Sequence, residues 1–178
     1  STISAYHMNI PNAHIHGGDK SGGIDEYTRH AITKMSNIHF ASSQKSKERI
    51  LKMGENSKYV FFTGSPGIDE IKHMTITDKK TLESKYNFKF SGNEILFVQH
   101  PVTTQVQNTK NQIVNSLKAI QMINKPVIAV GPNSDAGNNI IFKYLQNYSK
   151  SQNSFHLFKS LPRADYLGIL KNSKILVG

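Results

Sequence analysis

Two histidines, two glycines and an aspartate follow one another closely in residues 14–19, His-Ile-His-Gly-Gly-Asp. Glycines let the backbone approach a ligand and turn its N–H groups towards an anion, while histidine and aspartate bind or transfer protons. The spacing fits neither a P-loop nor a dinucleotide-binding fingerprint. A flexible turn and a metal site on His14 and His16 are the alternatives, although neither an H-E-x-x-H spacing nor a third ligand accompanies the histidines.

Asp25 and Arg29 stand four residues apart in the next segment, a spacing that brings two side chains to one face of a helix. As an exposed ion pair they would contribute only about 0.3–0.5 kcal/mol. The functional interpretation is a carboxylate held by Arg29 at the start of a helix, where it could act on a substrate in the glycine-rich loop. The sequence alone leaves both interpretations open.

Two later loops carry polar side chains after apolar runs. His100 precedes Pro101, which keeps His100 in an extended conformation. Such a histidine could donate to a phosphate, act as an acid or base, or simply pack against the next helix. In the loop over residues 131–137, Asn133 could hydrogen-bond a ribose, a phosphate or a base, whereas Asp135 could cap the helix that follows.

The elements that must position these residues alternate between strand and helix patterns. This alternation predicts an α/β fold with parallel sheets, in which ligands bind beyond the carboxyl ends of the strands. Four polar loops, starting near residues 14, 64, 100 and 131, fall at such ends. The predicted strands cover residues 11–16, 38–41, 59–63, 95–98, 126–130, 155–158 and 174–177, and the predicted helices cover 25–36, 42–53, 108–123, a segment ending near 148, and one after Pro162. In the first helix the apolar stripe is expected to consist of Ile24, Thr28, Ala31 and Met35.

The domain organisation follows from a loss of apolar residues between positions 72 and 92, where lysines accumulate before a Ser-Gly-Asn break. We therefore expect residues 1–72 to be the end of one domain. Residues 73–93 are expected to be a linker region, and residues 94–178 the first part of a second domain.

Composition narrows the function classes. The chain has 178 residues, a net charge of +10 and no cysteine, which excludes disulfides, thiolate zinc sites and a cysteine nucleophile. A membrane helix needs a run of about 18 apolar residues, and the sequence contains no such run. The positive charge suits a polyanion or a phosphorylated substrate, or reflects a lysine-rich proteome. Nucleic-acid binding rests on charge alone, and a G-x-S-x-G elbow for serine catalysis is absent.

Four ordered motifs carry a resemblance to a known family. Residues 10–19 (IPNAHIHGGD) and 24–36 (IDEYTRHAITKMS) closely resemble the hydrolysing UDP-N-acetylglucosamine 2-epimerases of sialic-acid synthesis. Residues 99–104 (QHPVTT) and 132–137 (PNSDAG) resemble later motifs of the same family, in the same order. The similarity covers essentially the whole chain. It implies a GT-B-like fold, made of parts of two Rossmann-like domains with parallel sheets and a cleft between them.

The resemblance implies that UDP-GlcNAc and water become UDP and N-acetylmannosamine. UDP leaves by anti elimination to a 2-acetamidoglucal, and water then adds so that C2 inverts. This chemistry needs a base for the C2 proton, an acid for the glycal and stabilisation of the diphosphate. Family members usually carry Glu at the position of Asp19, whose reach is one methylene shorter. No cofactor and no metal are implied. The resemblance assigns catalysis to Asp19, Asp25 and His100, and substrate binding to His16, Gly17, Gly18, Arg29 and Asn133.

Three other functions are alternatives to this one. A related enzyme would act on a UDP-diacetamido-trideoxy sugar, a GT-B glycosyltransferase would transfer the sugar to an acceptor, and a basic nucleic-acid-binding module is the remote alternative. We expect a cytoplasmic protein with a UDP-sugar substrate, no nucleic-acid or membrane partner, and a homo-oligomer when full length. A Gly-Asp-Arg segment is expected before Ser1 and an Asn-Ser-Ser-x-Gly segment after Gly178, so residues 1–178 alone are expected to be inactive and to bind UDP weakly.

Overall fold

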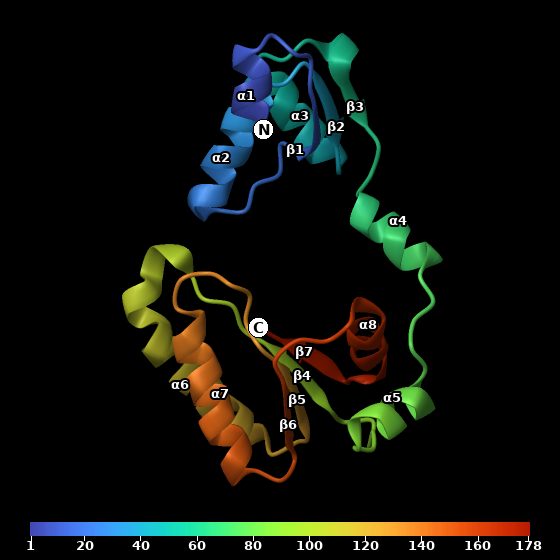
Figure 1. Ribbon diagram of the computed structural model, residues 1–178, viewed down its shortest axis with the longest axis vertical. Helices are drawn as coiled ribbons and strands as arrows, with labels where there is room; N and C mark the ends of the chain where they lie inside the picture. Colours follow the sequence, from blue (N-terminus) through green and yellow to red (C-terminus); the bar gives the residue numbers. More distant parts are fainter. The chain divides into compact units, whose positions relative to one another are not determined.

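The computed structural model describes residues 1–178, which form two compact units, Ser1–Met74 and Thr75–Gly178. Each unit has its own parallel sheet with helices packed against it (Figure 1). The predicted alternation of strands and helices is therefore confirmed. No helix combines the length and the hydrophobicity that a membrane span requires.

The first unit contains a three-stranded sheet in the order β1-β2-β3, with both pairings parallel. Connections from one strand to the next run through helices, as parallel neighbours require. Its elements are α1 (Thr2–His7), β1 (Ala13–Gly17), α2 (Gly23–Lys34), β2 (Ile38–Ala41), α3 (Gln44–Lys52), the 3-10 turn η1 (Ser57–Tyr59), β3 (Val60–Phe62) and α4 (Pro66–His73).

Helix α3 begins and ends where the sequence predicts. The Ser43 hydroxyl accepts a hydrogen bond from the backbone N–H of Ser46 at 3.1 Å, which is a helix N-cap. Gly54 follows the last turn with φ +92°, the left-handed conformation that closes many helices. Between these ends, Ile50 is fully buried against β2 and β3, so α3 is the helix that anchors the small sheet.

Helix α2 buries a different face from the predicted one. Ile24 is 63% exposed, whereas Thr33 is fully buried. The Thr33 hydroxyl donates to the Arg29 carbonyl and also contacts the His14 ring at 3.1 Å. The helix therefore packs on β1 through polar side chains that are hydrogen-bonded, and the apolar stripe expected from spacing was wrong.

The second unit has a four-stranded sheet in the order β6-β5-β4-β7, again entirely parallel. Figure 1 shows α6 and α7 together on one face of this sheet, with α8 on the other. Its elements are α5 (Lys79–Tyr86), β4 (Ile95–Val98), the 3-10 segment η2 (Thr103–Asn108), α6 (Thr109–Ile123), β5 (Val127–Val130), α7 (Asn138–Ser151), β6 (Phe155–Phe158), α8 (Arg163–Asn172) and β7 (Ile175–Val177).

Strand β4 shows why a continuous apolar run fits this position. Ile95 and Phe97 point into the cluster formed with α6 and α7, while Leu96 points into the cluster formed with α5 and α8. A parallel strand covered on both faces has no side to expose to water, so the usual alternation of apolar and polar residues is lost.

The expected linker over residues 73–93 needs correction. Most of this segment belongs to the second unit, where α5 packs against α8. Leu82 is fully buried there, together with Phe88 and Phe90. Three well-placed apolar side chains are enough to dock the segment, although its lysines and low apolar density suggested a connector.

A buried carboxylate holds this docked segment in place. Asp165, in the first turn of α8, is 3% exposed and accepts hydrogen bonds from Thr77 at 2.6 Å and Lys85 at 2.6 Å, and one from Tyr86. Burial alone would raise the pKa of Asp165, but the hydrogen bonds from Lys85, Thr77 and Tyr86 hold it at about 2. The charged form of Asp165 therefore stabilises the attachment of α5 to α8.

The polar loops singled out in the sequence do follow the carboxyl ends of β1, β3, β4 and β5. The loop after β1 passes close to the backbone of α3. A side chain on Gly18 would collide with the Ser46 carbonyl oxygen and lie 2.8 Å from Cγ1 of Ile50, and φ at Gly18 is +76°. The loop can cross α3 at this point only because Gly18 has no Cβ.

Gly18→Ala is expected to lower the free energy of unfolding of the first unit by about 2–4 kcal/mol, since overpacking adds to left-handed backbone strain. Gly54→Ala is the matched control, because φ is also positive there but nothing lies within 4 Å of the added Cβ. The control is expected to cost about 1 kcal/mol. Urea unfolding of both variants checks this, and equal losses would contradict the close approach at Gly18.

Asp165→Asn is expected to destabilise the second unit by about 2 kcal/mol at pH 7. Because the folded pKa of about 2 lies below the unfolded value of 3.8, the contribution is complete above pH 3.8 and is lost as the pH falls through 2. Urea unfolding between pH 2 and pH 7 should show the difference from wild type shrinking in acid. Lys118→Ala, an exposed change on α6, should stay within about 0.5 kcal/mol throughout.

Candidate active site

The side chain of Asp19 is held at the carboxyl end of β1 by residues of the neighbouring strand and helix. Its Oδ1 accepts hydrogen bonds from the hydroxyls of Ser42, at 2.8 Å, and Ser46. Its Oδ2 lies 3.6 Å from Nδ1 of His16 and accepts no hydrogen bond from the serines. Two serine hydroxyls therefore engage one carboxylate oxygen, and neither engages the other.

The charge state of Asp19 follows from these contacts. Burial alone would raise the pKa of Asp19, but the hydroxyls of Ser46 and Ser42 and the nearby His16 and Arg29 bring it below its ordinary value. Asp19 is thus a carboxylate at neutral pH, in the form needed to accept a proton.

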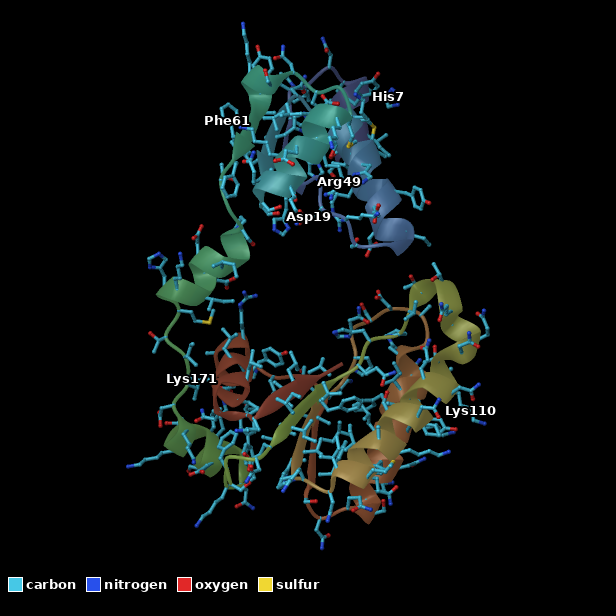
Figure 2. All side chains as sticks on the ribbon, turned by 180° about the vertical axis from the view of Figure 1, so that it is seen from behind. His7, Asp19, Arg49, Phe61, Lys110 and Lys171 are labelled. Carbon is cyan, nitrogen blue, oxygen red and sulfur yellow. The ribbon has the colours of Figure 1, made fainter.

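The backbone beside Asp19 is fixed by two arginines. Arg29 donates from Nη1 to the Asp19 carbonyl at 2.9 Å and to the Ser21 hydroxyl at 3.0 Å. Arg49, from α3, donates to the Gly18 carbonyl. Figure 2 shows Asp19 and Arg49 at the same end of the first unit. The two guanidinium groups together bind the carbonyls of Gly18 and Asp19 and the Ser21 hydroxyl, as side chains with several donors do well.

The predicted pairing of Asp25 with Arg29 does not form. Arg29 binds loop oxygens instead, because a backbone carbonyl and a hydroxyl lie within reach of its guanidinium. Asp25 is exposed in the first turn of α2. Its carboxylate is therefore accessible, but Arg29 does not hold it.

Glu26 organises the glycine-rich loop. Its Oε2 accepts the backbone N–H groups of Ser21 at 3.0 Å and Gly22 at 2.7 Å. The Gly22 N–H lowers the pKa of Glu26 most, against the smaller opposing effect of burial. These two N–H groups are occupied by a carboxylate of the chain itself, so they are not free to face an external anion.

The regular alternation of β1 does not extend from His14 to His16. His16 has φ +68° and lies at an irregularity of the β1–β2 register, so the alternation of the strand is broken there. His14 contacts Thr33, whose single proton goes to Arg29, so Nδ1 of His14 is the donor. Burial, with nearby positive charge, lowers the pKa of His14. No group of three His, Asp or Glu side chains could hold a metal ion.

In the second unit, His100 and Asn133 come together as neighbouring loops of parallel strands should. The backbone N–H of Asn133 donates to Nδ1 of His100 at 3.0 Å. A neutral imidazole that accepts at Nδ1 carries its proton on Nε2. The contact therefore leaves His100 with an Nε2–H donor, the group that a phosphate oxygen would need.

The Asn133 side chain is also fixed. Its Nδ2 donates to Oδ2 of Asp135 at 2.6 Å, and the Asp135 N–H donates back to its Oδ1 at 3.3 Å. Asp135 therefore braces Asn133 and does not cap α7, whose N-cap is Gly137 without a side-chain hydrogen bond. A side chain on Gly137 would lie 3.2 Å from Cβ of Pro101, so this loop packs closely against the loop of His100.

A cavity of about 340 Å³ opens beside this cluster, beyond the carboxyl ends of β5 and β6. Sequence reasoning missed the part contributed by Lys159 and Ser160, which directly follow β6; their position after a strand was the available signal. It also missed the hydroxyls of Ser42 and Ser46 and the guanidinium of Arg49. The cavity is lined by Pro132, Asn133, Ser134, Asn138, Asn139, Phe142, Lys159 and Ser160.

The larger cavities of the first unit lie elsewhere. Cavities of about 450 and 480 Å³ are both lined by Ser36 and Asn37, which precede β2. In a parallel sheet this is the end opposite to Gly17, Gly18 and Asp19. The size of the cavities therefore does not favour the end of the sheet at which Asp19 lies.

Comparison with known proteins adds a family to this geometry. A family described as UDP-N-acetylglucosamine 2-epimerase matches residues 1–178. The chain is 35% identical over 178 residues to the UDP-N,N'-diacetylbacillosamine 2-epimerase (hydrolyzing) of Legionella pneumophila, covering 100% of this chain and 47% of that protein. It is 37% identical over 174 residues to the GDP/UDP-N,N'-diacetylbacillosamine 2-epimerase (hydrolyzing) of Campylobacter jejuni, covering 96% of this chain and 45% of that protein.

Solved structures agree on the fold. The UDP-GlcNAc 2-epimerase from Neisseria meningitidis, bound to UDP-GlcNAc, superposes with a TM-score of 0.76 at 21% identity and covers 98% of this chain and 49% of that one. The fold is thus α/β and GT-B-like, with parallel sheets. The chain spans about half the length of the curated relatives it matches. With a family match along all 178 residues, the chain belongs to the UDP-N-acetylglucosamine 2-epimerase family.

Proposed function

We propose that this chain is part of a hydrolysing UDP-sugar 2-epimerase, which releases UDP and a free 2-epimerised 2-acetamido sugar. The observation that carries the proposal is the carboxylate of Asp19. Its Oδ1 is occupied by two serine hydroxyls, and its Oδ2 is not engaged by them. Family membership supports the reaction type, and the geometry supports a proton-transfer group at this position.

The proposed reaction has two stages. A base removes the C2 proton while the C1–O bond to UDP breaks, which gives UDP and a glycal. Water then adds its oxygen at C1, and a proton is returned to C2 on the opposite face. Asp19 and Asp25 are the proposed groups for the proton steps, because both are accessible carboxylates in the first unit.

His100 and Asn133 are the proposed groups for the nucleotide. The Nε2–H of His100 would donate to the diphosphate as negative charge develops on the leaving group. The adjacent cavity of about 340 Å³ is in the size range of small-molecule sites and contains Lys159, which suits an anionic ligand. The proposed contacts of His16, Gly17, Gly18 and Arg29 with substrate rest on the resemblance.

Two substrates fit this reaction. The sequence resemblance predicts UDP-GlcNAc. The names of the relatives at 35% and 37% identity favour a second candidate, the UDP-linked N,N'-diacetylbacillosamine, which carries a further acetamido group. The substrates share the C1, C2 and 2-acetamido atoms at which the proposed chemistry takes place, so the same carboxylates would serve either one.

The reaction is tested by incubating the complete gene product with each UDP-sugar in deuterated water and following the sugar by proton NMR. The expected result is release of UDP and a free sugar inverted at C2 and carrying deuterium there. The preferred substrate is the one with the larger kcat/KM. UDP release without a 2-epimer would point to a glycosyltransferase or a simple hydrolase and would overturn the proposal. Residues 1–178 alone serve as a second sample and are expected to be inactive.

The role of His100 is tested separately. His100→Ala removes the Nε2–H donor and is expected to lower kcat by about 100- to 1,000-fold, with weaker UDP binding. His73→Ala, an exposed histidine at the end of α4, is the matched control and should leave both unchanged. Steady-state kinetics and calorimetry with UDP measure the two effects. Unchanged turnover in His100→Ala would contradict the assignment.

A further inference from the structure

The hydroxyls of Ser42 and Ser46 converge on one oxygen of Asp19 although they come from different elements. Ser42 follows β2, and Ser46 is in the first turn of α3. Ser46 is 3% exposed, so its hydroxyl is shielded from water. Neither serine belongs to the motifs that pointed to chemistry.

The number of hydroxyl protons determines which of these groups donates and which accepts. The Ser46 hydroxyl has one proton, and Asp19 accepts it, because an ionised carboxylate can only accept. The Ser43 hydroxyl lies 2.7 Å from that of Ser46 and must therefore donate to it. Ser43 also accepts the N–H of Ser46 as the N-cap of α3. A directed chain runs from Ser43 through Ser46 to Asp19, and it ties the carboxylate to a helix terminus.

We propose that Ser42 and Ser46 are positioning residues for Asp19: they occupy Oδ1 and rotate the carboxylate so that Oδ2 is the oxygen that exchanges protons with substrate. This inference rests on the proposed function. The χ2 angle of an aspartate is broadly distributed, and rotation about it exchanges the two carboxylate oxygens. Two hydroxyl donors to Oδ1 fix this angle in Asp19. A short side chain benefits most from this, because aspartate cannot adjust its reach as glutamate does.

The other polar neighbours of Asp19 do not fix the orientation of its carboxylate. The ionisable groups facing Asp19 are the imidazole of His16 from β1 and the guanidinium groups of Arg29 from α2 and, at the preceding carbonyl, Arg49 from α3. Both arginines donate to backbone oxygens, so they fix the main chain and not the carboxylate. Oδ2 approaches only His16, at 3.6 Å, which is longer than a hydrogen bond. Orientation of the side chain therefore depends on the two serines.

The first test needs no enzyme activity. Carboxyl ¹³C NMR titration of residues 1–178 reports the pKa of Asp19 directly. In Ser42→Ala/Ser46→Ala the pKa is expected to rise, because two donors to the charged form are lost while burial stays. Ser36→Ala is the matched control, since its hydroxyl donates at 2.8 Å to the Ile32 carbonyl of α2 and does not touch Asp19. An unchanged Asp19 pKa in the double variant would overturn the proposal.

The second test uses the complete gene product. The double variant is expected to lose about 10- to 100-fold in kcat with KM changed by no more than about twofold, the result of a misplaced catalytic group. Its acid limb of the pH–rate profile should move to higher pH, since Asp19 must be charged to accept a proton. Ser42→Thr keeps the hydroxyl and should restore activity relative to Ser42→Ala. Loss of kcat with an unmoved acid limb would mean a structural role only.

The two tests separate the two claims. If wild type has no epimerase activity but the Asp19 pKa rises in the double variant, the proposed function fails and the serine contact stands without a catalytic role. If wild type turns over and the titration of Asp19 is unchanged in the double variant, the function stands and the positioning role fails. Where the double variant does not fold, Ser42→Ala alone supplies both measurements, because Ser42 is outside α3.

Discussion

The structure of the first unit depends on the contact between the backbone of Gly18 and helix α3. Without a Cβ at Gly18, the Ser46 carbonyl and Ile50 come into direct contact with the loop. That approach lets Arg49 reach the Gly18 carbonyl and lets Ser46 reach Asp19. The residue that buries the core, Ile50, is one turn from the residue that holds the carboxylate. Core packing and site geometry are therefore set by the same close contact.

In the second unit, the residues of the candidate site are positioned by the packing of two neighbouring loops. Its sheet is covered on both faces, so its strands are rigid platforms and the loops after β4 and β5 lie side by side. Gly137 packs near Pro101, and the backbone of Asn133 meets the ring of His100. A backbone donor, rather than a carboxylate, fixes the imidazole tautomer here. This backbone N–H is uncharged, so it adds no full charge beside the imidazole ring.

Much of the fold could be read from the sequence, because alternating strand and helix patterns and capping residues such as Ser43 and Gly54 are local signals. Helix α5 was missed, since three buried side chains among many lysines leave little local pattern. The site was read only in part. The contacts of Ser42 and Ser46 with Asp19 span 23 and 27 residues, and they exist only once α3 has packed. Arg29 donates to loop oxygens and does not pair with Asp25. The helical spacing of Asp25 and Arg29 alone cannot reveal this preference.

Glu26 gives the glycine-rich loop a property that its composition hides. Four glycines in seven residues would make most loops costly to order, because glycine has the largest backbone freedom to lose. Here the carboxylate of Glu26 already holds the amides of Ser21 and Gly22. The entropy of ordering is lost once, when the chain folds, and not again at each encounter with a ligand. A ligand that bound at this loop would therefore find it already ordered, and its binding free energy would not be reduced by ordering the loop.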